Sequence, residues 1–399
     1  MRLAWILVLA ASGCRGILGI EQPVDVIDAA VDAPELCATW HPQGFDPCTL
    51  GAAMPALHLG AGQYVYDTTL DGGKLTDSAG QLVAQSRLTV LQSDGSAVAV
   101  LSVDALAIDA GATLRVVGLR PLLVVAWSTA VIDGAIDAGS HIGMPALGAN
   151  ANVVCAGTAG IDGTNASIMG GSGGGGGGGF QGQGGHAGSG GTSPAASGGR
   201  GGSAVATAPA AIHGGCPGGA SGTAGGVAVP PATPVTQTRG GAGGGAIWLV
   251  AHDSIEIAGS ISANGAGGAG AQLGSVCGGG GGGAGGHVAL EAPSVTISGT
   301  ATANGGGGGG GGAVTDPGHD GEDGKADVQA AAGGALAAKS CGRPGGAGSA
   351  QAMLAGSDAL GTDTCGGGGG GGAAGFIIIA SPGYTATPTA KISPPAIVP

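Results

Sequence analysis

The most regular hydrophobic pattern in the chain is a strand-like segment that occurs four times, at 121–139, 246–265, 287–305 and 376–393. One single-residue gap is enough to align the copies on a shared alanine. After this alanine, apolar and polar residues alternate, so that Ile255 and Ile257 share one face of a strand and Glu256 lies on the other. β-Branched residues dominate the apolar set in the first three copies. This period of two predicts β-strands with one buried face.

A single copy of this segment cannot bury its apolar face by itself, whereas copies stacked in parallel share one apolar interior. The repeat therefore predicts an all-β fold, a short parallel β-solenoid of the right-handed β-helix type that carries long glycine-rich loops. An antiparallel sandwich built from the same strands is the alternative. Two-residue hairpin turns are scarce and the copies lie tens of residues apart, which favours the solenoid.

Shorter strand-like runs precede the first copy, between 57 and 117, and prolines follow the last one. The repeats therefore divide the chain into segments of different character. We expect a lipoprotein signal peptide at 1–14, an acidic tether at 15–36, an N-terminal β region with the first solenoid rungs at 37–139, a glycine-rich insertion at 140–245, solenoid rungs with a short glycine loop at 246–304, a second glycine-rich insertion at 305–375, and the last rung with a proline-rich C-terminus at 376–399.

Glycine accounts for 94 of the 399 residues, against roughly 7% in average proteins. Ordering a residue's backbone costs about 1–2 kcal/mol, glycine costs the most, and these segments offer few large side chains in return. We therefore expect the glycine-rich insertions to be disordered loops. The alternative is a bundle of extended polyglycine helices, in which neighbouring backbones hydrogen-bond closely. The uninterrupted runs are Gly173–Gly179, Gly278–Gly283, Gly305–Gly312 and Gly366–Gly372.

The first residues have the pattern of a secretory signal. Arg2 supplies a positive charge, an apolar stretch follows from Leu3 to Ala11, and small residues precede Cys14. We expect Cys14 to be lipidated, with an ordinary signal peptide and a chance cysteine as the alternative. No later stretch approaches eighteen consecutive apolar residues, so the mature chain is expected to be anchored to a membrane rather than to span it. Arg15 after the cysteine favours the outer membrane or cell surface.

The cysteines beyond Cys14 are expected to form disulfides in an oxidising compartment. No C-x-x-C pair is present, which disfavours zinc. Cys37 with Cys48 is the favoured pair, because it closes a short loop, and the odd total leaves one thiol over. The disulfide candidates are Cys37, Cys48, Cys155, Cys216, Cys341 and Cys365.

An acidic segment in the second insertion is a weak candidate for calcium. Its carboxylates are hard oxygen ligands of the kind that Ca²⁺ prefers. Neither the RTX nonapeptide nor the EF-hand loop is present, so we expect a solvated acidic loop and no resident metal. The residues concerned are Asp316, Asp320, Glu322 and Asp323.

Charge and motifs disfavour several functional classes. With 9% charged residues and a net charge of -13, the chain offers no basic patch for nucleic acid. The glycine runs contain G-x-G-x-x-G but no helix follows them, so we expect no nucleotide and no other cofactor. His252, beside Asp253 and Ser254, is expected to be a partly exposed histidine, because neighbours in a strand point to opposite faces and cannot form a triad.

The chain resembles the uncharacterised glycine-rich lipoproteins of GC-rich, myxobacterial-type genomes along most of its length. The resemblance lies in the lipobox around Cys14, RPLLVVAWS from Arg120, IDGAIDAGS from Ile132 and ISANG from Ile261. The rungs look more distantly like those of β-helical adhesins. Such proteins bring no catalytic residues that can be carried over to this chain.

We therefore expect a non-enzymatic, surface-exposed lipoprotein with a structural or adhesive role, and no catalytic residues. Its partners would be a membrane, through the lipid, and cell-surface polysaccharide or other cells. The alternative is a polysaccharide-active β-helix enzyme, a lyase or hydrolase. Enzymes of that kind present carboxylates from adjacent rungs, but the position of Asp133 becomes Ala258, Ser298 and Thr387 in the other copies.

Lipidation at Cys14 predicts a simple phenotype. Only a thiol at this position takes the diacylglyceryl group, so Cys14→Ser should move the exported protein from the detergent phase to the aqueous phase in a partition assay. Cys277→Ser is the control and should partition like the parent. Membrane association of Cys14→Ser at the parental level would contradict lipidation.

Overall fold

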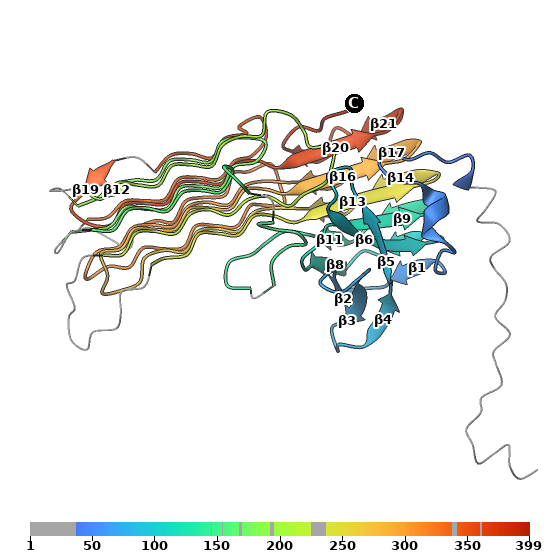
Figure 1. Ribbon diagram of the computed structural model, residues 1–399, viewed down its shortest axis with the longest axis horizontal. Helices are drawn as coiled ribbons and strands as arrows, with labels where there is room; N and C mark the ends of the chain where they lie inside the picture. Colours follow the sequence, from blue (N-terminus) through green and yellow to red (C-terminus); the bar gives the residue numbers. More distant parts are fainter. Residues whose placement is uncertain are drawn as a thin grey trace, which may run out of the picture.

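We analysed a computed structural model of the chain. The structure describes residues 37–144, 146–153, 155–166, 170–191, 195–224, 237–336, 341–359 and 361–399. The expected signal peptide, Cys14 and the acidic tether at 15–36 lie outside the described residues. Figure 1 shows two parts, a block of β-strands at one end and a bundle of long extended segments at the other.

Nearly all strands belong to one of three sheets, in which most neighbours run parallel. Sheet 1 has the order β20 (Phe376–Ala380), β16 (His287–Glu291), β13 (Ala246–Ala251), β9 (Leu122–Ala126), β6 (Ala97–Val103) and β5 (Leu88–Leu91). Sheet 2 has the order β1 (Leu57–Leu59), β7 (Leu106–Ile108), β10 (Thr129–Ile132), β14 (Ser254–Ile257), β17 (Ser294–Ile297) and β21 (Gly383–Ala386). Sheet 3 has the order β22 (Lys391–Ser393), β18 (Thr300–Thr302), β15 (Ser260–Ser262), β11 (Ala135–Asp137), β8 (Ala112–Val117), β2 (Gly62–Asp67), β3 (Lys74–Asp77) and β4 (Leu82–Gln85).

Each copy of the sequence repeat gives one strand to each sheet, and equivalent residues pair in register. Ile132 pairs with Ile257 and Ile257 with Ile297, and all three side chains are buried. Glu256, on the opposite face of its strand, is exposed. The apolar faces of the three sheets enclose one core of aliphatic residues, in which Tyr66 is the largest buried side chain. Its hydroxyl donates to the carbonyl of Gly72 at 2.7 Å.

Stacked glycines form the corner between the second and third strand of the first three copies, and Pro388 takes this position in the fourth. A Cβ on Gly134 would overlap the carbonyl oxygens of Asp109 and Ala112, one on Gly259 that of Gly134, and one on Gly299 that of Gly259. The chain turns here without room for a side chain. This corner splits what the period-two pattern presents as one strand into two, such as β10 and β11.

The prediction of an all-β chain is correct, but the prediction of a single parallel β-solenoid is wrong. The strands form several sheets, and the pairing is mixed. β3 pairs antiparallel with β2 and β4, and β5 with β6, because tight turns near Gly72, Gly80 and Gly95 join these strands directly. A further sheet has two strands, β12 (Ser189–Gly190) and β19 (Thr362–Asp363). It lies in the bundle, away from the other three sheets (Figure 1).

The described parts of the two glycine-rich insertions and of the short glycine loop between them form the bundle, and the expectation that these segments are disordered is wrong. Their inner members are four nearly side-chain-free segments, 171–180, 276–286, 304–313 and 365–375, which contain the four uninterrupted glycine runs. The segment 171–180, for example, is surrounded by other segments. It exchanges backbone hydrogen bonds with 156–166, 181–190, 196–205, 213–224, 276–286 and 365–375.

The hydrogen bonds of the inner segments repeat every third residue. Gly173, Gly176 and Gly179 all donate to the segment 156–166, while Gly174 and Gly177 donate to 181–190. Such threefold symmetry without hydrogen bonds inside a segment is typical of the polyproline II helix. The alternative interpretation, a bundle of extended polyglycine helices, is therefore what the structure shows.

Inner glycines have no space for a Cβ. At most of them the nearest atom to a Cβ would be a carbonyl oxygen of the adjoining segment, such as that of Arg200 at Gly176 or Gly371 at Gly177. The Cα–H group of the glycine faces this oxygen instead, a weak hydrogen bond that also recurs between strands of β-sheets. Glycine is thus required here for close approach of backbones rather than for a left-handed conformation.

Ten outer segments surround the inner four, and each hydrogen-bonds to the next. Exposed side chains such as Arg200 and Arg239 project from this ring, whereas short ones such as Thr238 and Ser349 hydrogen-bond inward to Gly278 and Gly305. In order around the ring the segments are 156–166, 196–205, 181–190, 354–359, 342–349, 331–336, 317–324, 264–272, 237–245 and 213–224, which meets 156–166 again. Disulfides join Cys155 to Cys216 between two outer segments and Cys341 to Cys365 between an outer and an inner one, with Cα–Cα distances of 5.5 and 5.6 Å.

The close packing predicts that the inner segments do not accept alanine. A Cβ at Gly176 would overlap the Arg200 carbonyl, so Gly176→Ala should lower the free energy of unfolding by about 1–3 kcal/mol, measured by denaturant titration. Gly60→Ala is the control, because nothing lies within 4 Å of a Cβ there. It should change stability by less than about 0.5 kcal/mol. Equal stability of the two variants would contradict the packing.

Candidate functional site

Polar and aromatic side chains outside the core gather at three places. The first is a groove on the outer face of sheet 1, which we call the sheet groove. The second is a hollow on the side of the bundle, which we call the bundle trough. The third is a cluster of charged residues where sheets and bundle meet, which we call the junction cluster.

The sheet groove exists because the N-terminal segment covers part of sheet 1. The 3-10 helix Pro47–Leu50 and the disulfide Cys37–Cys48, with a Cα–Cα distance of 5.1 Å, hold this segment in shape. Trp40 and Leu50 pack on the outward valines of β6, β9 and β13. Beside them, two connected hollows of about 230 and 530 Å³ share Gln43, Glu291, Ala380 and Pro399 in their walls.

Glu291 is the one acidic side chain that the described residues contribute to the walls of the sheet groove. Its Oε1 accepts the backbone N–H of Gln43 at 2.6 Å, and its carboxyl group also accepts from the Trp248 side chain. Burial raises the pKa of Glu291 to about 7, and these two hydrogen bonds oppose the rise only partly. The carboxyl group therefore titrates closer to neutral pH than an exposed glutamate does.

His287 lies deeper in the sheet groove and is completely buried. Its ring packs near Phe180 and Phe376, with centroid distances of 6.5 and 5.8 Å. Neither ring nitrogen has a hydrogen-bond partner among the described residues. Burial, with a smaller contribution from nearby His213, lowers its pKa to about 3, so the ring is neutral at physiological pH.

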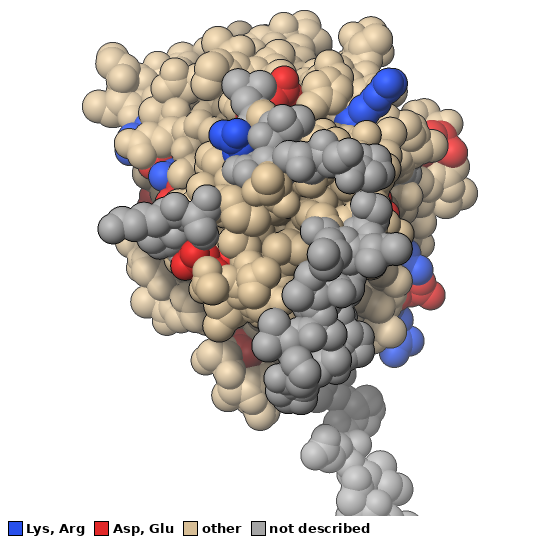
Figure 2. Space-filling model, turned by 90° about the vertical axis from the view of Figure 1, so that its left-hand side faces the viewer, with Lys and Arg blue, Asp and Glu red and all other residues tan. Residues whose placement is uncertain are grey.

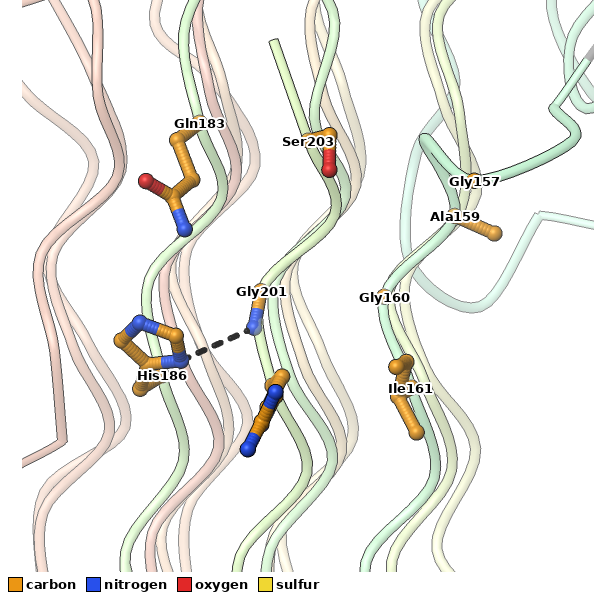
Figure 3. Close-up of a pocket in the computed structure, with 9 residues that line it drawn as sticks. Gly157, Ala159, Gly160, Ile161, Gln183, His186, Gly201 and Ser203 are labelled. Carbon is orange, nitrogen blue, oxygen red and sulfur yellow. Dashed lines mark hydrogen bonds between the residues drawn. The ribbon is translucent and has the colours of Figure 1, made fainter.

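The bundle trough, with a volume of about 840 Å³, runs over three adjoining outer segments (Figure 3). Gln183 and His186 lie along one segment, and Ala159 and Ile161 lie along the segment on the opposite side. Between them, the segment 196–205 carries glycines beside Arg200 and so forms a low floor. The Nδ1 atom of His186 accepts the N–H of Gly201 at 3.3 Å, which orients the ring.

The junction cluster joins sheet 3 to the bundle. His141 Nε2 lies 2.8 Å from Asp137 and Nδ1 lies 3.2 Å from Asp323, while Arg115 lies 2.6 Å from Asp137. Hydrogen bonds to Asp137 and then to Asp323 raise the pKa of His141 to about 9. Burial disfavours ionisation of both carboxyl groups, but hydrogen bonds and charges around them outweigh it and lower their pKa values. Every member has a charged partner, which indicates a structural role.

The acidic candidates for calcium do not converge on one point. Asp320 accepts the N–H of Gly270, and Glu322 accepts that of Ala332 and lies 3.0 Å from Lys325. Asp323 belongs to the junction cluster. Within the described ranges, no three His, Cys, Asp or Glu side chains are grouped so that they could hold a metal ion. The segment uses its carboxylates to bind neighbouring backbone, a role that the sequence pattern did not indicate.

The prediction that His252 is partly exposed is confirmed, but the prediction that it points away from Asp253 is wrong. The two residues lie in the turn between β13 and β14, where strand alternation does not apply, and His252 Nδ1 is 2.6 Å from the Asp253 carboxylate. The ring also packs on Trp40 at a centroid distance of 5.4 Å. This contact explains the position of the histidine without catalysis.

The residues that line the sheet groove and the bundle trough were not predicted from the sequence. A signal was present for Glu291, because the equivalent residues in the other copies are Val125, Val250 and Ala380. His186 and Arg200 were hidden in the glycine-rich segments, where no strand period marks a face. Cys277, the remaining cysteine, is buried and is not in a disulfide.

The chain matches no protein family, no curated protein and no solved structure in these comparisons. Through the part of the chain that the structure describes, no helix is long and apolar enough to cross a membrane. Function is therefore inferred from the geometry of the sheet groove and the bundle trough and from the sequence.

The junction cluster predicts a loss of stability at alkaline pH. The pKa of His141 is higher in the folded protein, at about 9, than its ordinary value of 6.5. Its contribution is therefore complete below about pH 6.5 and is lost as the pH rises through about 9. We expect the free energy of unfolding of the parent to fall by about 2 kcal/mol more than that of His141→Gln between pH 6.5 and pH 10.

His319→Gln is the control for this measurement, because His319 is exposed and its side chain lies outside the cluster. It should follow the parent over the whole pH range. Parallel pH profiles for the parent and His141→Gln would contradict the assignment.

Proposed function

We propose that the protein is a non-catalytic surface lipoprotein with a structural or adhesive role, exported and anchored through Cys14. In this proposal the bundle is a rigid arm, and its outer segments and sheet 1 present binding surfaces. The resemblance to glycine-rich lipoproteins of myxobacterial type supports the export and the anchor. The partners are cell-surface polysaccharide or other cells.

The observation that carries this proposal is the division of the bundle into inner and outer segments. The inner segments consist almost entirely of glycine and serve only backbone packing. The outer segments carry exposed charged side chains, such as Arg200, Arg239 and Glu322. Figure 2 looks at the tip of the bundle, where single Lys, Arg, Asp and Glu residues lie apart among uncharged ones. An arm of this kind holds surface residues at fixed spacing, as an adhesive or structural protein requires.

The sheet groove favours binding over hydrolysis of a polysaccharide. Glycosidases place two carboxyl groups about 5–9.5 Å apart on either side of the bond to be cleaved. Among the described residues, Glu291 is the one acidic side chain in the walls of the groove. The half-buried Trp248 ring lines the groove and offers flat apolar surface there, while its N–H group is engaged by Glu291.

A combined binding and cleavage assay tests the proposal. Purified mature protein should be retained on immobilised polysaccharide from bacterial surfaces and should release neither new reducing ends nor unsaturated products from it. Protein unfolded by heat is the control and should not be retained. Product release would support the polysaccharide-active alternative, and failure to bind any surface polysaccharide or cell would contradict the adhesive role.

A further inference from the structure

We infer that the bundle trough binds an acidic polysaccharide, a glycan whose sugar residues carry an oxyanion such as a carboxylate. This inference rests on the proposed adhesive function and assigns it a site and a ligand class. The trough has the volume for a short stretch of glycan, about 840 Å³. Its walls combine hydrogen-bonding side chains on one side with apolar ones on the other (Figure 3).

The charge of the trough is opposite to that of the protein. The chain has a net charge of -13, yet Arg200 is the one charged side chain among the described residues that line the trough. Two carboxylates lie near the trough, Asp162 on a wall segment and Asp358 on the adjoining segment 354–359, and both hydrogen-bond to backbone. Asp162 accepts the N–H of Ala220, and Asp358 accepts the N–H of His186.

Arg200 is the residue that would bind the oxyanion. Its side chain is exposed and makes no ion pair among the described residues, whereas Arg115 and Arg120 are paired with Asp137 and Asp71. A planar guanidinium group binds a carboxylate through two parallel hydrogen bonds. Arg200 therefore has its full donor capacity available for a ligand.

The remaining walls fit a sugar rather than a small ion. Gln183 and Ser203 supply donors and acceptors for hydroxyl groups, and the fixed His186 ring presents a second nitrogen. Ile161, 57% exposed, and Ala159 supply apolar surface for the C–H faces of a sugar ring. A ligand can approach the backbone closely at Gly201 of the floor and at Gly157 and Gly160 of the neighbouring wall, because these residues have no side chains.

Calorimetric titration of the full mature chain tests the site. The probes are oligogalacturonate, a sulfated dextran oligosaccharide and an uncharged dextran oligosaccharide, at about 0.1 M salt so that long-range charge effects are screened. Oligogalacturonate should bind, and Arg200→Gln should weaken binding at least about tenfold. Arg239→Gln removes the same charge from another exposed arginine of the bundle that lies outside the trough and should leave binding unchanged.

The outcomes separate the ligand source from failure of the site. If only the sulfated probe binds the parent, and Arg200→Gln but not Arg239→Gln weakens this binding, the site recognises the same oxyanion chemistry and its source is a sulfate ester. Equal weakening by Arg200→Gln and Arg239→Gln, equal binding of uncharged dextran, or no binding of either acidic probe would overturn the inference. If Arg200→Gln binds cells as well as the parent, adhesion stands and the trough is not its site. If the parent itself binds no surface, the proposed function fails.

Discussion

Close contact of backbone with backbone in the inner segments is the constraint on which the rest of the bundle depends. The position that a Cβ would occupy on these glycines is filled by a carbonyl oxygen of the next segment. Each added methyl group would therefore push two segments apart and break hydrogen bonds on both sides. The composition of the chain follows from this geometry, because only glycine allows four inner segments to be surrounded completely.

The energetics of this packing differ from those of an ordinary core. Ordering a glycine costs about 1–2 kcal/mol, while a backbone hydrogen bond contributes a net of about 0.5–1.5 kcal/mol. The backbone hydrogen bonds alone therefore only offset the conformational entropy that the glycines lose on folding. Dense dispersion contacts between backbones, the aliphatic core that holds both ends of each insertion, and the disulfides at Cys216 and Cys365 supply the remainder. The bundle is stable as an extension of the sheets.

The sequence predicted the strands well and their arrangement only in part. Alternation at Ile255, Glu256 and Ile257 identified the buried face, since a strand has a fixed period of two. It did not reveal the corner at Gly134. The backbone atoms that crowd this glycine belong to Asp109 and Ala112, and the sequence does not show that these residues lie beside it. The bundle was given only as the alternative to disorder, for a related reason. Its stabilising contacts lie between segments far apart in the chain, such as 171–180 and 365–375, whereas entropy arguments consider each segment alone. The same separation hid the trough, whose residues come from three segments.

Amide hydrogen exchange followed by mass spectrometry tests whether the four inner segments are ordered and hydrogen-bonded in solution. Peptides that cover Gly173–Gly179, Gly278–Gly283, Gly305–Gly312 and Gly366–Gly372 report on the inner segments, and peptides from β13 and β16 report on the sheets. Because the inner amides are hydrogen-bonded and surrounded by the ring, their exchange should be slowed at least about a hundredfold relative to unstructured glycine, as in the strands. Exchange of all four runs at the rate of an unstructured chain, while β13 and β16 remain protected, would contradict the bundle.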